Sequence, residues 1–91
     1  MNELSADSGG QYSEIADQQL DDLEAQDPEL YSDVIDVCEA IFTSPSRAQG
    51  MSAAVQTSDG IVFRIAVPGR HPYKVFWTSE GPRIEAIFPY A

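Results

Sequence analysis

The sequence has one cysteine, no long apolar run, and no basic residue in its first half. Cys38 alone cannot form an internal disulfide, and no Cys/His grouping has the spacing of a zinc site. No stretch is long and apolar enough to span a membrane, and the polar start has no basic, apolar leader. These absences predict a cytoplasmic protein without a metal, without another cofactor and without a membrane partner.

The charges are divided unequally between the two halves of the chain. Residues 1–46 contain twelve carboxylates and no Lys or Arg, whereas residues 47–91 contain five basic and three acidic residues. The formal charges of the halves are −12 and +2, which gives −10 for the whole chain at pH 7. So acidic a surface repels phosphate, which argues against nucleic-acid binding by the whole surface but not by a local basic patch. Two surfaces with different partners are expected.

The chain is short enough to form one domain. Residues 1–11, MNELSADSGGQ, are polar and without periodicity, which predicts a disordered tail. Residues 12–91 contain 3.6-residue and then 2-residue hydrophobic periods, as expected of a single folded domain.

Two amphipathic helices are predicted next. Residues 13–26 place apolar side chains at helical spacing, and Ser13 can cap the N-terminus. Asp27 and Pro28 suit the N-cap and first position of a second helix, which runs to about Phe42. So short a link predicts an antiparallel hairpin. The apolar stripe of the first helix is expected to comprise Ile15, Ala16, Gln19, Leu20 and Leu23.

From residue 52 the hydrophobic period changes to two. Segments 52–57, 61–67, 73–78 and 83–88 alternate and are separated by turn residues, which predicts an antiparallel meander. The fold class is therefore α+β, with an N-terminal helical hairpin packed on one face of a four-stranded antiparallel sheet. On the last strand, strict alternation places Ile84, Ala86 and Phe88 on the face opposite Arg83, Glu85 and Ile87.

The same alternation places three cations on one side of the sheet. If the apolar faces of the strands turn toward the helices, Arg64, Lys74 and Arg83 project from the other side, within about 5 to 10 Å of one another. Cations with aromatic side chains on an open sheet can hold a phosphate backbone. A solvated sheet face is the alternative interpretation, because antiparallel sheets commonly expose one charged face.

Three further residues are candidates for substrate binding near these cations. Arg70 and His71 lie in the turn between two of the strands, and Phe76 shares the face of Lys74. For His71 an exposed turn residue is the favoured interpretation, because loops are usually solvated. Cys38 lies on the apolar stripe of the second helix, which predicts a small core residue rather than a nucleophile.

Residues 17–90 resemble the RelE/ParE superfamily of toxin–antitoxin systems in the order of their elements. The resemblance is carried by VIDVCEAIFTSP (Val34–Pro45), FRIAVPGRHPYKVFW (Phe63–Trp77) and RIEAIFPY (Arg83–Tyr90). In this family a helical hairpin packs on an antiparallel sheet. Members with ribonuclease activity cleave mRNA in the ribosome without a metal, whereas ParE-like members inhibit DNA gyrase.

The resemblance implies a catalytic role for four residues. Arg64, Lys74 and Arg83 match the basic positions that stabilise charge on the phosphate, and Tyr90 matches a terminal aromatic residue that assists proton transfer. It implies a metal-independent mRNA endoribonuclease or an RNA binder, with RNA or the ribosome and an antitoxin or another protein as partners. The chain departs from the family in its pI of about 4.1 and in having no strand pattern before the hairpin, as expected of a diverged member.

Two other functions fit the charge distribution. The acidic half can serve as a non-catalytic interaction module that binds a basic protein partner or mimics the charge of a nucleic acid. Alternatively, the acidic tail or the first helix can cover the basic sheet face and mask it.

Overall fold

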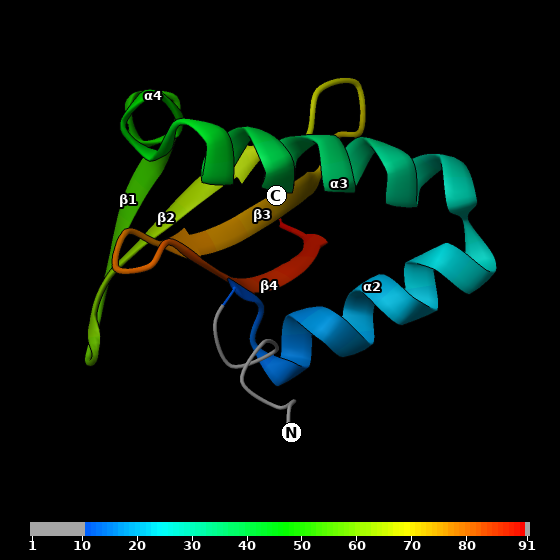
Figure 1. Cartoon of the computed structure of the whole chain (residues 1–91), viewed down its shortest axis with the longest axis horizontal. Helices are drawn as coiled ribbons and strands as arrows, with labels where there is room; N and C mark the ends of the chain where they lie inside the picture. The colour runs from blue at the N-terminus through cyan, green and yellow to red at the C-terminus, as the bar shows by residue number, and fades with distance from the viewer. Residues whose placement is uncertain (1–10, 91) are drawn as a thin grey trace.

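A computed structural model describes residues 11–90 and has the predicted α+β class, in which helices are followed by a four-stranded antiparallel sheet. The expected tail lies outside the described residues, except for Gln11. The helices are α2 (Glu14–Gln26), α3 (Pro28–Thr43) and the short α4 (Pro45–Gly50). The strands are β1 (Ala53–Thr57), β2 (Gly60–Ala66), β3 (Tyr73–Thr78) and β4 (Arg83–Pro89), and they lie side by side in chain order (Figure 1).

Both predicted helix caps are present. The Ser13 hydroxyl accepts a hydrogen bond from the backbone N–H of Ala16, and the Asp27 carboxylate accepts one from that of Leu30. Each side chain satisfies an N–H group that the first turn of a helix leaves unpaired. The expected apolar stripe of α2 is wrong at one position, because Ile15 is 63% exposed.

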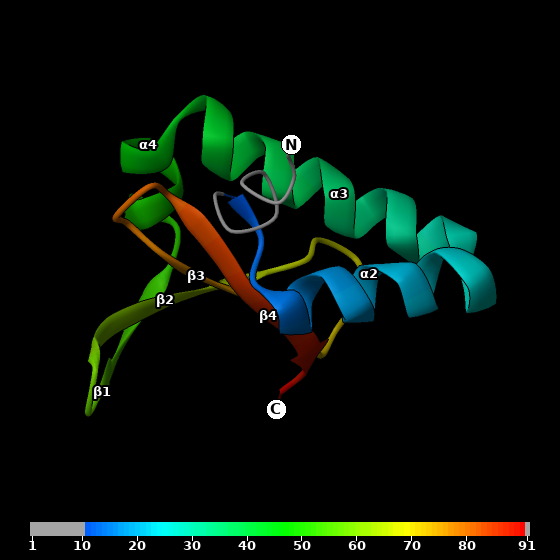
Figure 2. The same ribbon diagram turned by 60° about the horizontal axis from the view of Figure 1, so that its bottom comes forward.

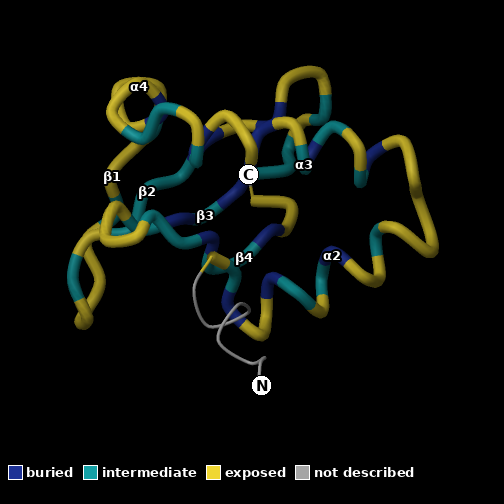
Figure 3. Tube along the Cα trace, in the orientation of Figure 1, coloured by how far each residue is buried: buried dark blue, intermediate teal, exposed yellow. Residues whose placement is uncertain are grey.

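The helices cover one face of the sheet, with α2 against β4 and α3 against β3 (Figures 1 and 2). Trp77 lies at the centre of the core with no exposed surface, and its indole N–H donates to the hydroxyl of Ser52 at 3.1 Å. Buried and more exposed residues follow each other along β3, as expected for a strand with one covered face (Figure 3). None of the helices within residues 11–90 is long and apolar enough to cross a membrane.

The outer edge of β4 is occupied by the chain that leads into α2 and by α2 itself. Tyr12 forms a single parallel bridge with Ile84, and the N–H of Ser13 donates to the Ile84 carbonyl at 2.9 Å. The Gln19 side-chain oxygen accepts from the N–H of Ile87 at 2.6 Å. Polar groups at this edge of the sheet therefore have partners from α2, which fixes the helix against the last strand.

A β-bulge interrupts the alternation of β4. Phe76 pairs with Ala86 but Trp77 pairs with Ile84, so Glu85 is an additional residue without a partner on β3. The bulge lets Ile84 and Ile87 both point into the core, where they are 0% and 3% exposed. The expected faces of Ala86, Ile87 and Phe88 are therefore wrong, since strict alternation does not continue past Glu85 and Phe88 is 36% exposed.

The bulge predicts an order of stability for two alanine variants. Ile87→Ala should lower the free energy of unfolding by about 2–5 kcal/mol, because it leaves a cavity in the core. Phe88→Ala should cost only about 1–2 kcal/mol, although it removes a larger side chain, because part of the ring already contacts water. Urea denaturation of both variants measures the difference. A larger loss for Phe88→Ala would contradict the bulged register.

Candidate functional site

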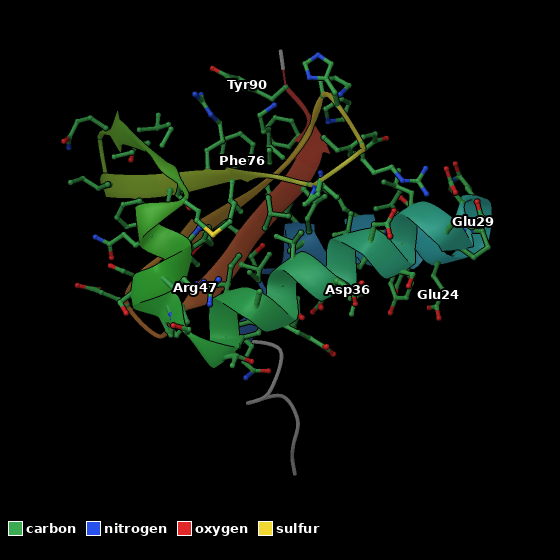
Figure 4. The ribbon with its side chains drawn as sticks, turned by 90° about the horizontal axis from the view of Figure 1, so that it is seen from above. Glu24, Glu29, Asp36, Arg47, Phe76 and Tyr90 are labelled. Carbon is green, nitrogen blue, oxygen red and sulfur yellow. The ribbon has the colours of Figure 1, made fainter. Side chains whose placement is uncertain are left out.

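Three aromatic rings and two cations gather on the open face, the side of the sheet opposite α2 and α3. We call this group the aromatic–cation cluster. The strand register aligns Arg64 with Phe76 and Lys74 with Phe88. Figure 4 shows Phe76 and Tyr90 on the side of the sheet away from the helices. The cluster comprises Arg64, Lys74, Phe76, Phe88 and Tyr90.

The rings form a partly exposed apolar platform. Phe76 and Phe88 stack with their centroids 4.7 Å apart and their planes 13° apart. Tyr90 meets both rings edge-on, at centroid distances of 5.6 Å and 6.3 Å. Because Tyr90 is 45% exposed, its ring is accessible to a ligand that reaches this face. Offset-stacked and edge-to-face pairs of this kind hold the rings in fixed orientations.

The two cations are held against the C-terminal end of the described chain. The Arg64 guanidinium carbon lies 5.0 Å from the centroid of the Tyr90 ring, a cation–π contact. The Lys74 ammonium donates to the carbonyl oxygens of Tyr90 and Pro72 at 3.1 Å and 3.3 Å, which leaves one of its three N–H groups for a ligand. Among residues 11–90, neither Arg64 nor Lys74 forms an ion pair with a carboxylate.

Arg83 does not join this cluster. It pairs with Thr78, which lies four residues along β3 from Lys74, or roughly 13 Å away at the usual rise of a strand. The expected separation of about 5 to 10 Å fits Arg64 and Lys74, which are diagonal neighbours about 7–8 Å apart. It does not fit Arg83 and Lys74. Arg83 lines a depression together with three acidic residues, Asp59, Glu80 and Glu85.

The two candidates from the turn between β2 and β3, Arg70 and His71, lie at the end of this hairpin. Arg70 forms an ion pair with Asp33 of α3, with Nε 2.7 Å from Oδ2, and this contact holds the turn against the helix layer. His71 is exposed. The neighbouring Pro72 accepts a backbone hydrogen bond from Tyr90 at 2.9 Å, so the turn positions Tyr90 beside β3. Arg70 therefore has a structural partner, whereas Phe76 lies within the aromatic–cation cluster as expected.

The helix side of the molecule has a different character. Ten carboxylates lie between Glu14 and Glu39, and within the described residues only Asp33 is paired with a cation. Because α2 packs on the covered face, it does not mask the cations, contrary to one of the expected arrangements. The tail, the other segment expected to mask the cations, lies outside the described residues except for Gln11.

A groove of about 310 Å³ lies between α3, α4 and β2. Val37, Ala48, Met51, Ile65 and Pro68 line this groove together with Asp33, Asp36 and Arg47.

Cys38 is a core residue, as its position on the apolar stripe predicts. It has no exposed surface, and burial raises the pKa of its thiol to about 12. A thiol that stays protonated and inaccessible is not a nucleophile. Residues 11–90 contain no group of three or more His, Cys, Asp and Glu side chains arranged to hold a metal ion.

Comparisons with protein-family models, with curated proteins and with solved structures find no match to this chain. The geometry of the open face is therefore the evidence for function. Sequence alternation missed Phe88 as a member of the cluster. The spacing of Ile84 and Ile87 could have indicated the bulge from the sequence. Two large apolar residues three positions apart in a strand reach the same core only through a bulge.

The buried thiol predicts a loss of stability in alkali. Burial raises the pKa values of Cys38 and Tyr12 to about 12, above their ordinary values of 9.0 and 10.0. Between about pH 9 and 12 the unfolded chain loses these protons before the folded chain does, so the free energy of unfolding falls as pH rises. In urea denaturation at several pH values, Cys38→Ala should be less stable at pH 7 because of its cavity, but its stability should fall less steeply above pH 9. Parallel curves for the variant and the wild type would contradict this.

Proposed function

We propose that this protein is a diverged relative of the RelE/ParE superfamily that binds single-stranded RNA on the open face of its sheet, without cleaving it. The observation that carries the proposal is the aromatic–cation cluster. Two cations without a described carboxylate partner lie among three aromatic rings on a sheet face that no described helix covers.

The chemistry of the cluster suits unpaired bases and a phosphate backbone. Bases of single-stranded RNA stack on exposed aromatic rings of antiparallel sheets, and this stacking contributes about 1–3 kcal/mol per base. The partly exposed rings of Phe88 and Tyr90 supply the stacking surface. Arg64 and Lys74 supply N–H donors for the phosphates beside those bases.

Binding is a better fit than cleavage for this arrangement. Metal-independent cleavage of RNA needs cations at the reacting phosphate and groups that move protons at both the attacking and the leaving oxygen. Of the four residues that the resemblance assigns to catalysis, Arg83 pairs with Thr78, four residues along β3 from Lys74, and lines a depression whose lining also includes carboxylates. Two of the three N–H groups of Lys74 are already engaged by carbonyl oxygens.

A second candidate function is the binding of a basic protein partner by the helix side. It is favoured by the carboxylates of α2 and α3 and by the groove whose lining includes Asp33 and Asp36. The two functions use opposite faces of the molecule, so one set of variants separates them. Asp21→Lys/Asp22→Lys changes α2 alone. It should weaken binding of a basic protein and leave RNA binding unchanged or stronger.

RNA binding is tested by the fluorescence anisotropy of a labelled, unstructured oligoribonucleotide at several salt concentrations. Tyr90→Ala should weaken binding about 5-fold or more, because it removes a stacking surface. Arg64→Ala/Lys74→Ala should weaken it as well and should make the salt dependence shallower, by about 0.7 in the log–log slope for each phosphate that no longer meets a cation. A duplex of the same sequence should bind more weakly, since its bases are already stacked.

Arg47→Ala is the matched control. It removes the same charge from α4, on the helix side of the sheet (Figure 4), and should leave the affinity within about 2-fold of the wild type once its long-range effect is screened by salt. An equal loss for Arg47→Ala, or no measurable binding by the wild type at low salt, would contradict the proposal.

The absence of cleavage is tested separately in cells. Expression of the wild type should leave growth and mRNA length unchanged, as should expression of Arg64→Ala/Lys74→Ala/Arg83→Ala. Growth arrest with cleaved mRNA that disappears in the triple variant would make the protein a ribonuclease instead.

A further inference from the structure

The two edges of the sheet differ in how they are protected. The edge of β4 is covered by Tyr12, Ser13 and Gln19, as described above. On the other edge, four of the five residues of β1 are exposed. The strand sequence, AAVQT, contains no charged residue and no proline, the features by which edge strands usually avoid pairing with other chains. Within the described residues, β1 is thus an unprotected pairing edge.

The position of β1 makes this edge accessible. The β1–β2 hairpin extends away from the helices in Figures 1 and 2, and its tip is exposed in Figure 3. Glu24 and Glu29 lie at the far end of the helix layer from α4, which carries Arg47 and leads into β1 (Figure 4). Two copies that approach through β1 therefore keep the far ends of their acidic hairpins apart.

We infer that two copies of this chain pair through their β1 strands, antiparallel and about a two-fold axis at Val55. The pairing joins two four-stranded sheets into one continuous sheet. An antiparallel strand pair about such an axis is isologous, so each copy contributes the same surface and the assembly closes as a dimer.

The side chains of β1 are complementary in this register. Val55 faces its own copy, and Ala54 faces Gln56 of the second copy, so no like charges oppose each other. Within one chain Val55 already pairs with Val62, and both side chains are half-buried. The two-fold axis extends this pair into a row of four valines across the joined sheet. Contacts between β-branched side chains on one sheet face stabilise such pairing.

The dimer is expected to be weak and to depend on salt. Pairing of two five-residue strands buries less than the roughly 1,200 Å² of a stable interface. Each copy also carries a net charge of −10, and screening of this repulsion favours association. Dimerisation should therefore increase with ionic strength.

Pairing through β1 places both open faces on the same side of the joined sheet, so one RNA strand can contact two aromatic–cation clusters. This consequence rests on the proposed RNA binding, but the pairing itself does not. Salt distinguishes the two failures, since salt should strengthen the dimer and weaken RNA binding.

Sedimentation velocity of the full chain over a wide concentration range tests the dimer. The average mass of the wild type should rise above the 10.0 kDa of the monomer as concentration increases, and more so at high salt. Val55→Lys should remain monomeric, because it places two ammonium groups opposite each other. Gln49→Lys makes the same charge change on the exposed surface of α4 and should dimerise like the wild type. Far-ultraviolet circular dichroism checks that each variant is folded.

A cysteine variant decides the question if Val55→Lys fails to fold. Val55→Cys should form a disulfide-linked dimer under mild oxidation, since directly opposed residues of antiparallel strands come within reach of a disulfide. The buried Cys38 should not react, and Gln49→Cys should cross-link much less. A wild type that stays monomeric up to near-millimolar concentration at high salt would overturn the inference. So would dimerisation of folded Val55→Lys, or equal cross-linking of Gln49→Cys.

Discussion

One additional residue in β4 determines the character of both faces of the sheet. Because Glu85 has no partner on β3, Ile84 and Ile87 both reach the core although three positions separate them. The same shift turns Phe88 outward, where its ring stacks on Phe76. A regular strand would place Ile87 in water and Phe88 under the helices. The core and the aromatic platform thus depend on the same irregularity, which is typical of bulges near functional surfaces.

The charge distribution separates the two sides of the molecule. The helices α2 and α3 carry carboxylates and no Lys or Arg, and the acidic residues in their first turns interact favourably with the helix dipoles. Further carboxylates repel phosphate from the helix side. Among residues 11–90 no ion pair joins Arg64, Lys74 or Arg83 to a carboxylate, but Arg83 lines a depression whose lining also includes three carboxylates. For the proposed RNA binding, this distribution favours the part of the open face that carries the rings.

The sequence predicts the elements of this fold better than the contacts between them. Ser13, Asp27 and Pro28 mark the helix starts, and alternating apolar residues with short turns mark the strands, because caps and periodicity act locally. Local patterns do not reveal which side chains from distant elements meet. Arg70 pairs with Asp33, which is 37 residues away in the sequence, and no local pattern indicates this contact. Gln19, assigned to the apolar stripe, instead accepts a hydrogen bond from β4.

For the proposed RNA binding, the acidity of the chain favours recognition by stacking over recognition by charge. A net charge of −10 opposes the approach of RNA, and two cations offset little of that repulsion. Base stacking is not screened by salt and does not depend on net charge, so the rings can supply most of the affinity. Arg64 fits both roles, because its guanidinium packs on the Tyr90 ring while its N–H groups can still reach a phosphate. Cleavage would require additional cations at one phosphate, and Arg83 lies too far from Lys74 to act as one of them. The same placement that is compatible with the proposed binding surface thus weakens the basis for catalysis.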